Sequence, residues 1–435
     1  MLNRLVNSKF KKDVLVSYFT QFYTVLMGFF QLFLINKYFG IEVFGQLSVI
    51  IATAGIFSSL LTARSSEAVT RFLKREFLKN NLKNVKFVLY IGFFIDFVTA
   101  IFLLLIIYLL SDKIAYYFLK NNNLNYEVFL YSFVTFFLFI RGTVMGYLLS
   151  KEMIFHIKMM EIIESSMKII LLIMCIYLFN FISLRNLIYI MIFSSFISLL
   201  YAYYIFFNSY IKALRNIKVN FNKNILKEYW NFNLKTFFSS SLKAGNQNLD
   251  NLMLGYFLNT EIVGLYQVLK KIASPILIIA SPFSLIVYPK LIKYFETNQK
   301  NKFIDIILKI SFYILVMSVV YSLITYLFLD NILKFMSINI NSLQYNVNLY
   351  YLFVLFLHIL IAEMWWVRIF SNTVNPNYSI IMNLFATFYQ LSITIIATKI
   401  FGLIGLLFSI MIMNFLILIF WLKKGYKYVY TYIHT

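Results

Sequence analysis

The sequence predicts an all-α integral membrane protein with about twelve transmembrane helices in two six-helix lobes. Its 435 residues are 61% hydrophobic and 13% charged, more apolar than a soluble fold of this length needs. Runs such as 97–110 are continuously apolar without period-2 alternation, so the spans are helices and not barrel strands. A turn sequence near the N-terminus also recurs half a chain later, which indicates two related lobes.

The apolar segments, taken in order, are each long enough to cross the hydrocarbon core of a bilayer. We expect spans at 14–35, 43–63, 87–110, 127–149, 161–179, 185–207, 236–257, 262–287, 304–328, 347–370, 379–398 and 401–422. The first six form an N-terminal lobe, 1–207, and the last six a C-terminal lobe, 236–435. The basic segment 208–235 is then a linker between the lobes.

The net charge of +22 would indicate a nucleic-acid ligand in a soluble protein. Here about 26 of the 39 Lys and Arg residues fall in the termini and in alternate loops, and about six fall in the opposite loops. This asymmetry predicts a multi-pass protein with both termini in the cytoplasm and no nucleic-acid partner. The basic linker either only determines the topology or also lies on anionic membrane lipid.

The sequence lacks the residues expected for disulfides, metal or cofactor binding, and glycosyl transfer. A single cysteine, Cys175, excludes an intrachain disulfide and a thiolate metal site, and the three histidines lack ligand spacing. We therefore expect no metal and no bound cofactor. The predicted external loops are short and contain no Asp-x-Asp motif, which argues against a membrane glycosyltransferase or polysaccharide polymerase.

The recurring turn is the stretch around which the chain is organised. It joins two apolar segments between Leu249 and Pro275, and a weaker copy lies at Lys37 to Ile50, about 219 residues earlier. The alignment pairs Glu42 with Glu261. Internal repeats of this kind are common in secondary transporters, whose substrate site lies between the repeats.

The same turn carries a family resemblance. An acidic residue, Gly-Leu-Tyr-x-Val, a basic pair and a proline appear as Glu261, Gly264, Leu265, Tyr266, Val268, Lys270, Lys271 and Pro275. This pattern resembles the polysaccharide exporter branch of the multidrug/oligosaccharidyl-lipid/polysaccharide (MOP) superfamily, in particular an O-antigen-type (Wzx-like) flippase.

The resemblance implies a MATE/MOP-like fold of two pseudo-symmetric lobes around a central cavity. It implies alternating access in a bacterial inner (cytoplasmic) membrane. The implied substrate is a polyprenyl-diphosphate-linked oligosaccharide, with polysaccharide polymerase and chain-length machinery as candidate partners.

Polar residues inside the predicted spans are the candidate site residues, since charge at bilayer depth is costly unless it faces protein or water. In the seventh span Lys243, Asn246, Gln247 and Asp250 share one helix face. Such a face lines a water-filled cavity or forms a polar seam between helices. The corresponding face of the first span is also polar, which favours the cavity.

The other basic candidates are Arg141, Lys168, Lys270, Lys271 and Arg64. Lys168 has Glu164 one turn away as a potential partner. Arg141 has no partner nearby in sequence, and it faces either a cavity or a closely packed helix. Lys270 and Lys271 contact substrate or reach outward to the interface. Arg64 is a phosphate contact at the cavity mouth or an ordinary flanking charge.

The carboxylates available for coupling to H⁺ or Na⁺ are Asp250, Glu363 and Asp96. Trp365 and Trp366 beside Glu363 predict an interfacial aromatic belt, with a sugar-stacking platform as the alternative.

The excess of basic over acidic candidates predicts a cationic cavity and an anionic substrate. We therefore favour a flippase that moves a lipid-linked oligosaccharide to the outer leaflet. The alternatives are a cation-coupled small-molecule antiporter of the same fold and, from another class, a membrane glycosyltransferase or polymerase.

Overall fold

The computed structural model describes residues 2–61, 65–178, 182–219, 221–287, 294, 297, 299–338, 346–367 and 377–430. Within these ranges the side chains of 2–11, 14, 65, 211–213, 234–247, 281–286, 300, 377, 379–380 and 425–430 are not described. The chain divides into two compact units, Met1–Asn248 and Leu249–Thr435, here called the first and second units. The division falls inside a helix, α9, that begins within the predicted linker.

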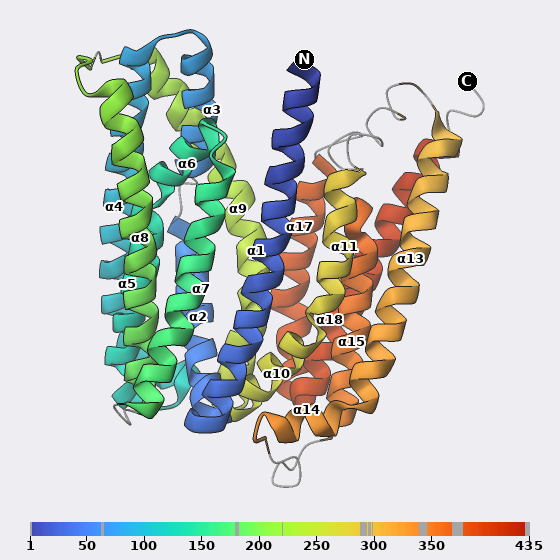
Figure 1. The fold of residues 1–435 in the computed structure, drawn as a ribbon. Coiled ribbons are helices and arrows are strands. Elements are labelled where there is room, and N and C mark those ends of the chain that lie inside the picture. Colours follow the sequence, from blue (N-terminus) through green and yellow to red (C-terminus); the bar gives the residue numbers. More distant parts are fainter. Residues whose placement is uncertain are drawn as a thin grey trace. The chain divides into compact units, whose positions relative to one another are not determined.

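The first unit is built from long helices that run side by side, with shorter helices near one end (Figure 1). Its elements are α1 (Leu2–Phe39), α2 (Ile41–Leu61), α3 (Ser65–Leu78), α4 (Leu82–Ile114), η1 (Ala115–Leu119), η2 (Asn122–Leu124), α5 (Asn125–Ile140), α6 (Gly142–Ser150), α7 (Ile154–Tyr177), α8 (Leu184–Leu214) and α9 (Lys223–Phe257), which continues into the second unit. Helix α1 packs on α7, α4 and α8 pack on α5, and α3 packs on α4 and α6.

The second unit contains short and long helices, several of which contact α15. Its elements are α10 (Thr260–Ala273), α11 (Pro275–Ile286), α13 (Lys300–Leu327), α14 (Leu329–Phe335), α15 (Val347–Glu363), η4 (Met364–Trp366), α17 (Asn377–Tyr389), η5 (Gln390–Thr394) and α18 (Ile395–Tyr430). Helix α15 contacts α10, α11, α13 and α18. The Tyr321 hydroxyl fastens α13 to α10 by donating to the Ile272 carbonyl at 2.7 Å.

The predicted all-α membrane fold is confirmed. Nine segments in the described part of the chain are long and apolar enough to cross a membrane. Helices α7 and α9 are not among them because they carry several charged or polar residues. The segment Ile381–Lys424 covers all of the last predicted span and all but the first two residues of the one before it. Each of the twelve predicted spans lies largely on helix where the structure describes it.

Local sequence explains where the helices end. Gly40 takes φ +87 between α1 and α2, a conformation that costs glycine little, and its N–H closes the last turn of α1 on the carbonyls of Ile35 and Asn36. At the matching turn of the repeat, the Asn259 side chain accepts the Ile262 N–H at 2.9 Å and caps α10. Helices α2 and α10 begin at Ile41 and Thr260, which are equivalent positions of the sequence repeat.

Two predicted spans are interrupted, and a third break lies where the last two predicted spans adjoin. The fourth divides at Arg141 between α5 and α6. The eighth divides at Ser274, because Pro275 lacks the N–H that would continue α10. Helix α18 has a break at Gly402, with φ 61 and ψ −139, a conformation that is essentially restricted to glycine.

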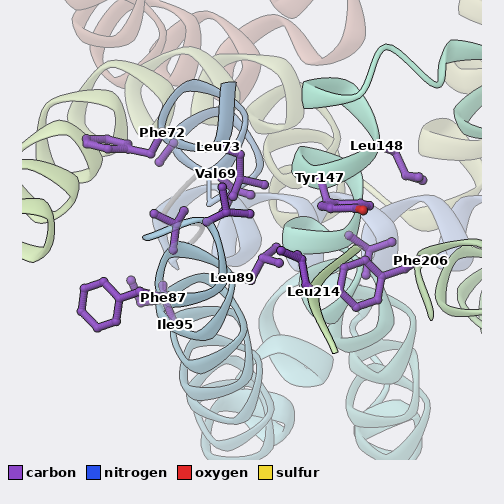
Figure 2. Packing of buried hydrophobic residues seen from close by; sticks show 14 of the residues in the cluster. Val69, Phe72, Leu73, Phe87, Leu89, Ile95, Tyr147, Leu148, Phe206 and Leu214 are labelled. Carbon is purple, nitrogen blue, oxygen red and sulfur yellow. The ribbon is translucent and has the colours of Figure 1, made fainter. Parts of the chain in front are cut away.

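A buried hydrophobic cluster fixes the positions of α3, α4, α6, α8 and the start of α9 (Figure 2). Val69 and Leu73 of α3 are fully buried, and Tyr147 of α6 packs against Phe206 of α8 with ring centroids 5.0 Å apart. On the polar side of α3, Arg75 donates to Glu228 at 2.5 Å. This hydrogen bond holds the pKa of the Glu228 carboxyl below its usual value. Helix α3 is thus an amphipathic helix held on both faces.

Candidate functional site

Arg141 is the centre of a charged cluster inside the first unit. It lies at the junction of α5 and α6, where its Nη1 donates to Ser198 Oγ of α8 at 2.7 Å and to Glu164 Oε2 of α7 at 3.4 Å. The other oxygen of Glu164 accepts from Lys168 Nζ at 2.8 Å. These three charged side chains are only 15–24% exposed. Four helices therefore meet at a cluster of two cations and one anion.

The cluster has an unbalanced positive charge. Glu164 is shared by both cations, so one positive charge is not neutralised within it. The Arg141 guanidinium has five N–H donors in a planar fork. Among the described residues, only its Nη1 has a hydrogen-bond partner. Its Nε and Nη2 donors are therefore available to an anionic group, for which arginine is the preferred bidentate partner.

Asp96 of α4 binds the N-terminus of α6 in the same unit. Its Oδ2 accepts the backbone N–H of Thr143 at 2.6 Å, in the first turn of α6, and its side chain is 5% exposed. A carboxylate at this position satisfies an unpaired N–H and interacts favourably with the helix dipole. Asp96 thus holds the start of α6 and, with it, the neighbouring Arg141.

Asp250 is the centre of a second cluster, inside the second unit. Its Oδ2 accepts from Lys270 Nζ at 2.6 Å and from the Tyr266 hydroxyl at 2.8 Å. The Lys270 ammonium also lies 4.8 Å from the centre of the Tyr266 ring. Because α9 and α10 are joined by a tight turn, the recurring sequence folds back and brings these residues together. The tyrosine and the first lysine of the motif are therefore partners of Asp250.

Lys271 and Glu363 are each partly buried and lack a full set of partners. No hydrogen bond or ion pair of the Lys271 side chain involves a described residue, although the neighbouring Lys270 is paired. The Oε1 atom of Glu363 is buried and has no hydrogen-bond partner in the described part of the chain.

The prediction of an aromatic belt or sugar platform at Trp365 and Trp366 is wrong. Both side chains are only 7% exposed, and Trp365 Nε1 donates to Ser311 Oγ of α13 at 3.1 Å. Helix η4 contacts α11, and the Trp365 hydrogen bond ties it to α13, so these buried rings do not form an exposed belt or platform.

Four predicted site residues lie outside what the structure describes. These are Arg64, whose placement is not described, and Lys243, Asn246 and Gln247, whose side chains are not described although they lie on α9. The cavity predicted between the lobes likewise stays a prediction.

The i, i+4 spacing predicted the Glu164–Lys168 pair, which is confirmed, but nothing in the local sequence indicated the partners of Arg141. Glu164 and Ser198 lie on other helices, 23 and 57 residues away, and no local spacing connects them with Arg141. The partners of Asp250 were also missed, although the short turn after α9 could have indicated them.

Comparison with known proteins places the chain in a family. The profile of the family described as "Polysaccharide biosynthesis protein" matches residues 10–295, well over half of the chain. No curated protein matches it. It is similar to the inward-facing structure of a multidrug resistance MATE family transporter of the MOP superfamily, at 14% identity, with a TM-score of 0.77 over 95% of this chain and 96% of that one.

Two further solved structures are similar. The outward-facing structure of a multidrug resistance MATE family transporter of the MOP superfamily has 14% identity and a TM-score of 0.60, covering 97% of this chain and 96% of that one. The Vibrio cholerae MATE transporter VcmN in its bent form has 12% identity and a TM-score of 0.58, covering 98% of both chains. At these identities the similarity shows the fold. The chain belongs to the polysaccharide biosynthesis protein family and is a multi-pass membrane protein with the fold of the MOP-superfamily transporters.

Proposed function

We propose that this protein is a flippase for a polyprenyl-diphosphate-linked oligosaccharide, moving it from the cytoplasmic to the outer leaflet of a bacterial inner membrane. Both termini lie in the cytoplasm in this proposal, as the distribution of basic residues favours. Membership of the polysaccharide biosynthesis family supports the substrate class, and the MOP fold supports transport by alternating access.

The observation that carries the proposal is the unneutralised positive charge at Arg141. Two oxygens of one phosphate group can accept hydrogen bonds from the Nε and Nη2 donors of Arg141 at the same time. Glu164 and Ser198 hold the Arg141 side chain from its other side, so the fork is oriented before an anion arrives. A transporter of organic cations has no use for an unpaired cation at this depth.

The proposed cycle uses this charge together with the lipid character of the substrate. Basic residues on the cytoplasmic side attract the diphosphate, and the sugar headgroup enters the protein while the polyprenyl chain stays in lipid. Arg141 and Lys168 then hold the diphosphate during the conformational change. Polysaccharide polymerase and chain-length machinery are the proposed partners on the outer side.

Coupling through a carboxylate requires one that can bind and release H⁺ or Na⁺. Glu363, with one buried oxygen lacking a described partner, is our preferred candidate. Asp250 is held by two donors and Asp96 by a helix N-terminus, so both have structural partners already.

The test is the mass and leaflet location of lipid-linked sugars in cells depleted of this protein. We expect complete oligosaccharide units to accumulate on the cytoplasmic leaflet. Wild-type protein and Lys334→Gln, which changes an exposed lysine of α14, should restore export, and Arg141→Gln should not.

Three other outcomes would contradict the proposal in different ways. Truncated units would indicate a glycosyltransferase, and complete unpolymerised units on the outer leaflet would indicate a polymerase. Unchanged lipid-linked sugars, with altered sensitivity to cationic drugs, would indicate an antiporter.

A further inference from the structure

A groove outside the candidate site runs between α4 and α8 on the first unit. It has a volume of about 290 Å³. Lys86, Tyr90 and Phe93 of α4 form one wall, and Tyr203, Phe207 and Tyr210 of α8 form the other. Leu89 and Phe206 lie between the walls and belong to the buried hydrophobic cluster shown in Figure 2. The groove is thus the open face of a packed core.

The spacing of the lining residues makes the groove continuous along both helices. The wall residues of α4 and those of α8 are both spaced at i, i+4 and i+7, counted from Lys86 and from Tyr203. Each set therefore occupies one helix face. The rings also hold one another. Phe93 of the α4 wall stacks on Tyr203 of the α8 wall at 6.1 Å, so the two walls meet at the end of the groove away from Lys86, and Tyr203 packs on Phe207 of its own wall at 5.8 Å. The walls are therefore formed before anything enters.

One end of the groove is cationic. Lys86 Nζ donates to the Ile217 carbonyl at 2.7 Å, just beyond the end of α8, and lies 6.0 Å from the centre of the Tyr210 ring. It also approaches the Arg215 carbonyl at 3.4 Å. An ammonium has three donors, so one remains for a further acceptor.

The two chain segments that form this end carry basic residues only, and the nearby Glu76, which accepts from Asn84 of α4 at 2.8 Å, is buried and paired with Arg75. Neither 82–95 nor 184–222 contains an aspartate or a glutamate, whereas Lys83, Arg215 and Lys218 accompany Lys86. The exposed side chains of Arg215 and Lys218 flank the carbonyl that Lys86 binds. The groove is thus apolar along its length and positive at its mouth.

We propose that this groove binds one anionic membrane phospholipid, with an acyl chain along the aromatic walls and the headgroup phosphate at Lys86. Charge complementarity selects this occupant. A zwitterionic phospholipid fills the groove equally well, but its own cationic group opposes the basic mouth. A helix from a partner protein would leave the Lys86 charge in apolar surroundings without a counter-charge.

The proposal does not depend on the transported substrate. The proposed lipid is bound on the outside of the first unit. There it contacts both the end of α8 and the start of α4. Loss of the lipid is therefore expected to weaken the hold of residues 215–219 on α4.

The experiment is native mass spectrometry of the full-length protein, released from nanodiscs containing equal amounts of phosphatidylglycerol and phosphatidylcholine. We expect one retained phosphatidylglycerol per chain, in preference to phosphatidylcholine. Lys86→Gln should lower that preference about fivefold, the effect of one basic residue at an anionic headgroup. Lys86→Arg should retain it.

Two further variants separate the groove from general lipid contact. Tyr90→Ala, which removes part of an exposed wall, should lower retention of phosphatidylglycerol. Lys113→Gln, at the far end of α4, should leave it unchanged. Thermal unfolding without added lipid identifies any variant that is misfolded. If Lys86→Gln is misfolded, the test is Lys86→Arg, which keeps the positive charge and should keep the preference for phosphatidylglycerol. Equal retention of both lipids, or unchanged selectivity in Lys86→Gln, would overturn the proposal.

Discussion

At the scale of single residues, charged groups inside the helices take part in small clusters. Arg141 and Lys168 share Glu164, and Asp250 is bound by Lys270 and Tyr266. The sequence predicted which residues are charged at membrane depth, because each stands out in an apolar run. It could not predict the partners of Arg141, since the choice of partner depends on how α5, α7 and α8 pack.

Glu164→Gln is expected to destabilise the protein although it removes only one charge. Arg141 and Lys168 would then repel each other without a shared counter-charge. Because these side chains are 15–24% exposed, we expect a loss of about 2 kcal/mol, below the value for a fully buried pair. Thermal unfolding of the purified protein in detergent measures it.

The matched control is the double variant Glu164→Gln/Lys168→Gln. It removes the repulsion as well as the shared anion, so part of the lost stability should return. A double variant that is no more stable than Glu164→Gln alone would contradict the shared-anion interpretation.

Tyr266→Phe is expected to lower stability by about 1.5 kcal/mol, since it removes a hydrogen bond to a carboxylate and keeps the ring. The loss is limited because Lys270 continues to bind Asp250. The corresponding control is Tyr108→Phe, which changes a 61% exposed ring. Equal thermal unfolding of the two variants would show that the Asp250 hydrogen bond contributes nothing.

At the scale of elements, the apolar runs predicted the helices well, and the helix ends less well. Lipid requires the backbone to be satisfied within the segment, so a long apolar run has few alternatives to helix. The eighth span was predicted as one segment, 262–287, whereas the structure divides it before Pro275, which lacks a backbone N–H. The early start of α9 at Lys223 was not predicted, because its first turns are polar and belong to no apolar run.

Close packing of α3 on α6 depends on Gly146. A Cβ at this position would lie 2.8 Å from the Ser66 carbonyl oxygen and 2.8 Å from Val69 Cβ. Neither atom belongs to the flexible end of a side chain. Gly146→Ala is therefore expected to cost about 1–3 kcal/mol of stability by forcing the helices apart.

Leu149→Ala on the same helix provides the comparison. Leu149 is 37% exposed, so its truncation removes fewer contacts than a buried leucine would lose. Thermal unfolding should rank Gly146→Ala as the less stable variant. The reverse order would contradict the importance of this close approach.

At the scale of the whole molecule, composition and loop charge predicted a polytopic helical protein, and the fold and family agree. The sequence repeat predicted equivalent turns, and α2 and α10 begin at equivalent positions. The sequence predicts the substrate less well than the fold. One fold transports many kinds of molecule, and only the binding site distinguishes among them. Arg141 is the described residue that most directly makes that distinction.

The proposed topology is testable at the two ends of α4. With 33 residues this helix is about 50 Å long, enough to exceed the hydrocarbon core, so its ends lie on opposite sides. In a Cys175→Ser background, Asn122→Cys should react with a membrane-impermeant maleimide added to intact cells. Lys79→Cys should react only after permeabilisation. Labelling in the opposite order would place the termini outside.

The most direct test of the central claim is transbilayer movement of a polyprenyl-diphosphate-linked oligosaccharide in vesicles containing only the purified protein. The fraction of substrate accessible to an external sugar-modifying enzyme is followed with time. We expect wild-type protein to increase the rate of exchange between leaflets, Arg141→Gln to abolish the increase and Arg141→Lys to retain part of it. An undiminished rate with Arg141→Gln, or no movement with the wild-type protein while a cationic drug is transported, would contradict the account.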